Sequence, residues 1–208
     1  MIDVVPDLVR LVTAVVLADE DALCAFAAEH GGERDDTALR EALLQAHLFC
    51  GFPRTLSALD TLRAAGLVLA PPIDAPIDAP IDTVAEALEP DAERARGAEL
   101  FDRIYADGAE GVRAHLTALD PTFASWIAEH AYGRVLSRPG LDAGARELLA
   151  VAALAATGHE RQLASHVRGA VRCGATPAEV EATMDAIAPL VRQDRLVRAR
   201  QVVARFAR

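Results

Sequence analysis

Apolar positions recur along most of the chain at the three- and four-residue spacing of amphipathic helices, and no segment alternates convincingly like a strand. Gly31, Gly66, Gly158 and Gly174 each follow such a run, where a glycine often ends a helix. Residues 176–179 (TPAE) have the pattern of a capping box with proline at the first helical position. The pattern predicts an all-α fold. Helices are predicted at residues 7–18, 20–30, 37–50, 54–65, 91–106, 108–118, 121–136, 143–157, 160–173, 177–188 and 190–206.

One segment interrupts the helical pattern. Residues 69–84 (LAPPIDAPIDAPIDTV) repeat Pro-Ile-Asp-Ala nearly three times. Proline at every fourth position excludes a helix, and the aspartates keep the segment solvated. We expect an extended linker over residues 67–90, or an ordered strap on the surface. The linker would separate an N-terminal helical repeat, residues 1–66, from a C-terminal one, residues 91–208, with a similar order of helices and turns.

Composition narrows the function classes. The 208 residues can build one sizeable domain or two small ones. Hydrophobic residues make up 52% and aromatic residues 4%, so the core must consist mainly of Ala, Val and Leu. The net charge of -10 argues against nucleic-acid or anionic-membrane partners. Because the chain has no lysine, Schiff-base chemistry and phosphate binding by a P-loop lysine are excluded.

Cysteine usage and the N-terminal segment predict a soluble, cytoplasmic protein. Cys24, Cys50 and Cys173 form no CxxC pair, which suits a reducing compartment better than a disulfide scaffold. Arg10 interrupts the N-terminal apolar run, which therefore reads as an amphipathic helix and not as a signal peptide. No apolar run is long enough to span a bilayer. We found no HExxH, GxSxG or Cys/His cluster, so we expect no metal and no cofactor.

Two stretches carry family motifs. Residues 132–184 contain G-x-V-x-x-R-P-G-L-D, an arginine that opens an apolar helix, H-V-R-x-A and G-x-T-x-E. Residues 40–60 resemble E-x-L-L-Q-x-x-x-Y-x-G-x-P, with Phe49 where tyrosine is usual. The chain thus resembles the carboxymuconolactone decarboxylase family, which includes the AhpD-type alkylhydroperoxidases. In most relatives the second motif follows the first, so the chain resembles a rearranged or two-repeat member. The matches to the first motif are Gly133, Val135, Arg138, Pro139, Gly140, Leu141, Asp142, Arg146, His166, Val167, Arg168, Ala170, Gly174, Thr176 and Glu179.

The resemblance also implies a reactive core. AhpD-type relatives carry E-(x11)-C-x-x-C-x-x-x-H, and placing the family histidine on His166 puts the glutamate at Glu147. The two cysteine positions then hold His159 and Gln162. A disulfide-cycling peroxidase needs an attacking thiolate and a resolving thiol. That activity is therefore not expected, although a single-cysteine variant stays an alternative.

Three residues are candidates for acid–base chemistry. His166 lies at the edge of an apolar stripe, where a histidine is either a tunable acid or base or a core residue bonded to a backbone carbonyl. Glu147 begins a helix that is apolar nearly all round, so it either assists His166 or is an ordinary first-turn glutamate. His47 lies on an inward stripe of the first half, as a site residue or as core packing.

Three arginines, Arg138, Arg146 and Arg168, are candidates to bind a substrate carboxylate. Each could instead form a structural salt bridge, for example with Asp142 or Glu147. Arg138 is the weakest candidate, because an arginine before Pro-Gly can simply fix a turn.

The leading hypothesis is a cofactor-free lyase of the lactone decarboxylase type. An arginine would hold a small anionic substrate, and His166, supported by Glu147, would deliver a proton to carbon as carbon dioxide leaves. The alternatives are an AhpD-like thiol peroxidase that uses Cys50 or Cys173, and a non-catalytic helical oligomeric module. The family resemblance implies a homo-oligomer, a trimer or hexamer.

Overall fold

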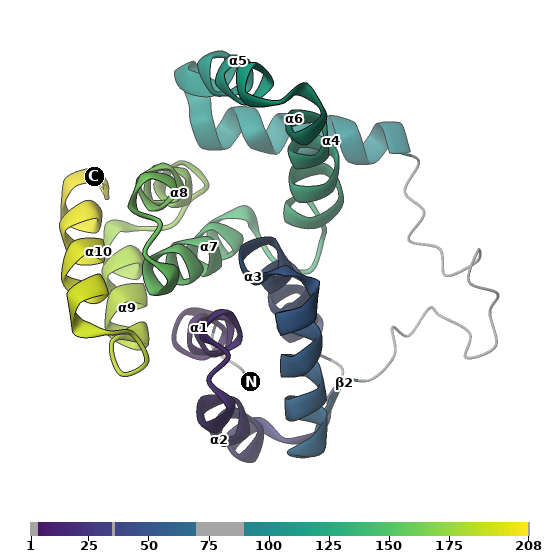
Figure 1. Cartoon of the computed structure of the whole chain (residues 1–208), viewed down its shortest axis with the longest axis vertical. Coiled ribbons are helices and arrows are strands. Elements are labelled where there is room, and N and C mark those ends of the chain that lie inside the picture. Colours follow the sequence, from purple (N-terminus) through teal and green to yellow (C-terminus); the bar gives the residue numbers. More distant parts are fainter. Residues whose placement is uncertain (1–3, 35, 70–89, 208) are drawn as a thin grey trace.

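The computed structural model describes residues 4–34, 36–69 and 90–207, and almost all of these residues are helical (Figure 1). The predicted all-α fold is therefore confirmed. In chain order the helices are η1 (Val4–Leu8), α1 (Val9–Leu17), α2 (Glu20–His30), α3 (Thr37–Ala64), α4 (Pro90–Tyr105), η3 (Ala106–Gly108), α5 (Ala109–Leu119), α6 (Pro121–Trp126), η4 (Ile127–Leu136), α7 (Ala143–Thr157), α8 (Glu160–Arg172), α9 (Pro177–Ile187) and α10 (Gln193–Phe206).

Local sequence signals set most helix ends. The side chain of Thr176 accepts a hydrogen bond from the backbone N–H of Glu179, and the Glu179 carboxylate accepts one from the backbone N–H of Thr176. The predicted capping box is thus confirmed. Gly158 ends α7 in the left-handed conformation, as predicted. Gly31 directly follows α2, as predicted, but its backbone is extended and the positive φ falls on Gly32.

Three of the predicted helices differ in detail from the structure. The segments predicted at 37–50 and 54–65 form one element, α3, which is broken at Gly51, where φ is 78°. The break permits Pro53 to follow without losing a backbone hydrogen bond inside a regular helix. The single helix predicted at 121–136 is an α-helix, α6, that continues as the wider π-helix η4.

A small strand pair was missed by the sequence analysis. Strands β1 (Gly32–Arg34) and β2 (Leu67–Leu69) pair in parallel, with Gly32 opposite Leu67 and Arg34 opposite Leu69. Three residues are too few to show an alternating pattern, so nothing in the sequence marked them. The pair joins the start of α3 to its end and leaves the helical fold class unchanged.

The two halves of the chain share one hydrophobic core. One cluster of buried residues joins α1, α2 and α3 to the α7–α10 group, and α1 packs against both α3 and α7. The division into repeats 1–66 and 91–208 stays a prediction. Of the predicted linker over 67–90, residues 70–89 lie outside the described part, residues 67–69 form β2, and Pro90 begins α4.

A second, smaller cluster builds the layer formed by α4, α5 and η4 (Figure 1). Phe101 and Ile104 of α4 pack here against Tyr132 and Leu136 of η4. The helices α4 and η4 pack closely where Gly97 meets Gly133. A Cβ atom at Gly97 would lie only 2.5 Å from the backbone nitrogen of Gly133. Within the described residues, no helix combines the length and the apolar character needed to cross a membrane.

Candidate functional site

A buried histidine–carboxylate pair lies between α7 and α8. Glu147 follows the first turn of α7, and His166 is in the middle of α8, which returns antiparallel after the turn at Gly158. The Nδ1 of His166 lies 2.9 Å from the Oε2 of Glu147, within hydrogen-bond distance. Glu147 is 1% exposed and His166 is 9% exposed. The structure thus brings together two of the residues that the sequence analysis selected.

Burial and charge act in opposite directions on the imidazole. Burial alone would lower the pKa of His166, because it disfavours the charged form. The negative charge of Glu147 and the hydrogen bond to it outweigh that effect, and the pKa of His166 is raised above its ordinary value. With Nδ1–H directed at the carboxylate, the remaining nitrogen, Nε2, is the atom that can give or take a proton.

A large cavity opens beside the imidazole. It has a volume of about 730 Å³ and lies between the main core and the layer formed by α4, α5 and η4. Cavities of this size commonly hold small molecules in proteins. Its lining residues are Leu48, Phe49, Phe101, Tyr105, Gly108, Gly111, Val112, His115, Leu116, Leu119, Phe123, Ile127, Ala131, Tyr132, Leu136, Leu154, Arg161, Gln162, Ser165 and His166.

Two tyrosine hydroxyls belong to the same cavity. The hydroxyl oxygens of Tyr105 and Tyr132 lie 3.0 Å apart. Burial raises the pKa of both phenols, and the nearby charge of Glu147 raises each further. Both groups therefore stay protonated at neutral pH and can donate hydrogen bonds. The sequence analysis selected neither tyrosine as a site residue, because their contact depends on the packing of α4 against η4.

The second family motif reaches the cavity from α3. Phe49, which stands where the motif has tyrosine, faces the ring of His166 edge-on at a centroid distance of 6.4 Å. Its neighbour Leu48 also lines the cavity. Both halves of the chain therefore contribute to this site, although the motif order along the chain is reversed.

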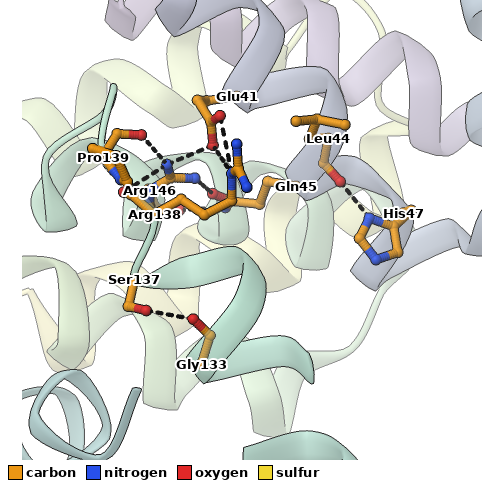
Figure 2. Close-up of polar contacts among 9 residues, drawn as sticks. All are labelled: Glu41, Leu44, Gln45, His47, Gly133, Ser137, Arg138, Pro139 and Arg146. Atoms are coloured by element: carbon orange, nitrogen blue, oxygen red, sulfur yellow. Dashed lines mark hydrogen bonds and ion pairs between the residues drawn. The ribbon is translucent and has the colours of Figure 1, made fainter. Parts of the chain in front are cut away.

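The same motif supplies a buried ion-pair network. The Nε of Arg138 donates to both carboxylate oxygens of Glu41 at 3.0 and 3.1 Å, and Nη2 of Arg146 donates to Oε2 at 2.8 Å (Figure 2). Nη2 of Arg146 also donates to the carbonyl oxygens of Arg138 and Pro139. Gln45 donates to the carbonyl of Arg146 at 2.7 Å. The two family motifs are thus joined in space by these contacts.

These contacts define the surroundings of the candidate arginines. Arg138 and Arg146 are not among the residues that line the His166 cavity, and both form an ion pair with Glu41. The third candidate, Arg168, lies on α8 with its guanidinium 4.6 Å from the ring centroid of Phe206. Arg161, which the sequence analysis did not select, is the arginine among the described lining residues.

His47 lies apart from the pair formed by His166 and Glu147, and it belongs to a separate histidine pair. Its Nε2 is 2.8 Å from the Nε2 of His130 on η4, its Nδ1 contacts the carbonyl oxygen of Leu44, and its ring stacks on Phe52 (Figure 2 shows His47 and Leu44). Burial, followed by the charges of His47 and Arg134, lowers the pKa of His130. His47 is half-buried and does not line the cavity. Among the described residues, no three His, Cys, Asp or Glu side chains are grouped as metal ligands.

The three cysteines occupy different surroundings and are all free thiols. Burial raises the pKa of Cys173 to about 11, and the charge of Glu147 adds to that shift. Such a thiol is almost entirely protonated at neutral pH and is a poor nucleophile. Cys50 donates to the carbonyl oxygen of Ala46 and contacts the hydroxyl of Thr55, and Cys24 is exposed. The positions of the family cysteines are held by His159, which is exposed, and by Gln162, which lines the cavity.

Spacing on α8 explains which further residues reach the cavity. Gln162, Ser165 and His166 recur at the three- and four-residue spacing of one helix face, and the neighbouring Arg161 also lines the cavity. The sequence contained this signal, but it could not show that the face borders an open cavity. Phe101 and Phe123 gave no comparable signal, because helices α4 and α6 reach the site only through tertiary packing.

Comparison with known proteins agrees with the motifs. The sequence model of the carboxymuconolactone decarboxylase family matches residues 121–205. Peroxisomal protein 2 of Schizosaccharomyces pombe is 30% identical over 156 residues, which cover 74% of this chain and 68% of that protein. The 4-carboxymuconolactone decarboxylase of Acinetobacter baylyi is 36% identical over 67 residues, which cover 32% of this chain and half of that enzyme. The chain belongs to the carboxymuconolactone decarboxylase family.

Proposed function

We propose that the protein is a cofactor-independent carboxy-lyase whose catalytic acid is His166. The observation that carries this proposal is the 2.9 Å contact between His166 and Glu147, made by an imidazole that also lines a cavity of about 730 Å³. The substrate class is a carboxylic acid in which the carbon that carries the carboxylate is attached to a carbonyl, either directly or through a carbon–carbon double bond. Carboxylated lactones and β-keto acids belong to this class.

The reaction needs one bond to break and one proton to arrive. The bond between the carboxylate carbon and its neighbour breaks, carbon dioxide leaves, and the electron pair moves into the conjugated carbonyl to give an enolate. Nε2–H of His166 then protonates the carbon, and water restores the proton to the imidazole. Glu147 acts as a positioning residue, because its carboxylate holds Nδ1–H and favours the imidazolium form.

The environment supports this assignment. Loss of the carboxylate charge is favoured in a site poor in water. The hydroxyls of Tyr105 and Tyr132 stay protonated, so they are suitable donors for the oxygen of the enolate. The binding role first given to Arg138, Arg146 and Arg168 stays a prediction, and Arg161 is the better-placed cation for an entering carboxylate.

The two alternative functions have less support. A thiol peroxidase would need a reactive thiolate, whereas the pKa of Cys173 is raised to about 11 and Cys50 does not line the cavity. If the protein were a purely structural module, neither the open cavity nor the buried ion pair beside it would have a role. A homo-oligomer, absence of a cofactor and a cytoplasmic location stay predictions. The name of the fission-yeast relative places that protein in the peroxisome.

The direct test is release of carbon dioxide from a panel of β-keto acids and carboxylated lactones. We expect turnover of at least one compound, and a loss of about 100-fold or more for His166→Gln, the usual contribution of a general acid. Glu147→Gln should slow the reaction less, because the imidazole remains. His159→Gln, at an exposed position, is the matched control. Equal rates for the wild type and His166→Gln would overturn the proposal.

A further inference from the structure

The cavity walls differ sharply in character. One wall is the face of α8 that carries the polar side chains Arg161, Gln162, Ser165 and His166. The other walls, from α3, α4, α5, α6, α7 and η4, present mainly apolar side chains; the exceptions are the hydroxyls of Tyr105 and Tyr132 and the ring of His115. A ligand that fills this space must therefore bury an apolar body, and its charged group meets the permanently charged side chain of Arg161 on the α8 wall.

The apolar surface continues to the mouth of the cavity. Leu119 at the end of α5 is 70% exposed, and Phe123 of α6 is 58% exposed, yet both line the cavity. Neither side chain contributes much to the folded core, because most of its surface faces water. Their position is explained if they contact the far end of a long apolar ligand.

Charge limits the number of anionic groups that such a ligand can carry. In the part of the chain that the structure describes, Arg161 is the permanently charged cation of the lining. The charge on His166 is already balanced by the buried carboxylate of Glu147. In a short ligand a second carboxylate would not reach the mouth and would lie inside the cavity, without a cationic partner and removed from water, which is strongly unfavourable.

We propose that the His166 cavity binds monocarboxylic acids with an elongated apolar body, and that it rejects small dicarboxylates. The carboxyl end lies on the α8 wall between Arg161 and His166, and the apolar body extends over Phe49, Leu116 and Phe123. This inference rests on the proposed function in one respect: it takes the cavity beside His166 as the substrate site. Among carboxylated compounds, the cavity should prefer those with acyl or aryl bodies.

Binding can be measured without any reaction, because saturated acids have no conjugated carbonyl and cannot lose carbon dioxide by this route. The probes are hexanoate, octanoate and decanoate, each paired with the diacid of equal length, and the dissociation constants come from titration calorimetry. Burial of each added methylene should tighten binding about three- to fourfold. Hexanedioate should bind at least about tenfold more weakly than hexanoate, because its second carboxylate must leave water, and the difference should shrink for decanedioate, whose far end reaches the mouth.

Matched variants place the binding in the cavity. Phe123→Ser should weaken decanoate binding by about tenfold or more while changing hexanoate binding little, because only the longer body reaches α6. Val197→Ser, on the exposed surface of α10 and outside the lining, should change neither. Equal weakening of decanoate by both variants would overturn the proposal, as would affinities independent of chain length or hexanedioate binding as tight as that of hexanoate.

The two proposals can fail separately. If alkanoates bind with the expected length dependence and no compound releases carbon dioxide, the substrate class stands and the lyase assignment fails. If small dicarboxylated compounds are turned over through His166 and alkanoates do not bind, the lyase assignment stands and the inference about apolar monoacids fails.

Discussion

Gly169 lies directly against the carboxylate of Glu147, so that a methyl group at position 169 would overlap with Oε2. The same methyl group would lie 2.9 Å from the side chain of Ile104. Because Gly169 follows His166 by one helical turn, both residues face α7, and the missing side chain leaves room for the carboxylate. The hydrogen bond between His166 and Glu147 depends on that space.

Gly169→Ala should therefore destabilise the protein and displace Glu147. Alanine favours a helix interior over glycine by about 0.5–1 kcal/mol. A methyl group forced into a packed interior costs about 1–3 kcal/mol, so we expect a net loss of about 1–2 kcal/mol in the free energy of unfolding. Urea denaturation measures this change in the free energy of unfolding. For comparison, Gly111→Ala on α5 meets no atom within 4 Å and should stabilise the fold slightly.

The raised pKa of His166 gives the ion pair a defined pH dependence. The pKa of a histidine in the unfolded chain is about 6.5. Between that pH and the higher pKa of the folded state, the folded protein binds more protons than the unfolded chain does. The stabilisation is complete below about pH 6.5 and is lost as the pH rises through the folded pKa. Unfolding free energies across this range should fall with pH for the wild type.

Glu147→Gln provides the control for that dependence. Without the carboxylate, only burial acts on the imidazole, so the pKa of His166 should fall below its ordinary value. NMR titration of the His166 ring protons measures this directly. An unchanged His166 pKa in the variant would show that Glu147 does not set the protonation of the site.

Removal of the Glu41 carboxylate should be far more damaging than removal of a surface carboxylate. Arg146 is only 1% exposed, and Glu41→Gln would leave its charge without a partner at a cost of about 3–5 kcal/mol. Glu29→Gln, which removes an exposed partner 3.9 Å from Arg10, should change stability by less than about 0.5 kcal/mol. Similar unfolding free energies for the two variants would contradict a structural role for the buried network.

The His47–His130 pair should make the fold sensitive to acid. With Nε2 atoms 2.8 Å apart, one ring must donate and the other must accept, so the pair tolerates at most one charge. Because the pKa of His130 is lowered, the folded state resists a proton that the unfolded chain accepts, and stability should fall as the pH drops below about 6.5.

His130→Gln tests this, because an amide can donate to His47 and does not titrate. The variant should lose less stability between neutral and mildly acidic pH than the wild type does. His159→Gln, at an exposed position, should keep the full loss. If His130→Gln and the wild type lose equal stability on acidification, other groups cause the acid sensitivity.

Local sequence determined the helices, their caps and the partnership of Glu147 with His166. Each of these depends on nearby residues or on a motif of fixed spacing: the capping box at Thr176, the turn at Gly158, and the helical faces of α7 and α8. Short-range hydrogen bonds and apolar periodicity act over one or two helical turns, so the residues themselves reveal them.

Tertiary structure alone decided which side chains share a site. Glu41 pairs with Arg146 across 105 residues of chain, Tyr105 meets Tyr132 across 27, and Phe49 faces His166 from the other half of the chain. The sequence analysis grouped three arginines with His166 because one motif contains them all. Packing of α3 against α7 placed Arg146 2.8 Å from Glu41, and Arg138 pairs with the same carboxylate, because a guanidinium removed from water needs an ionic partner.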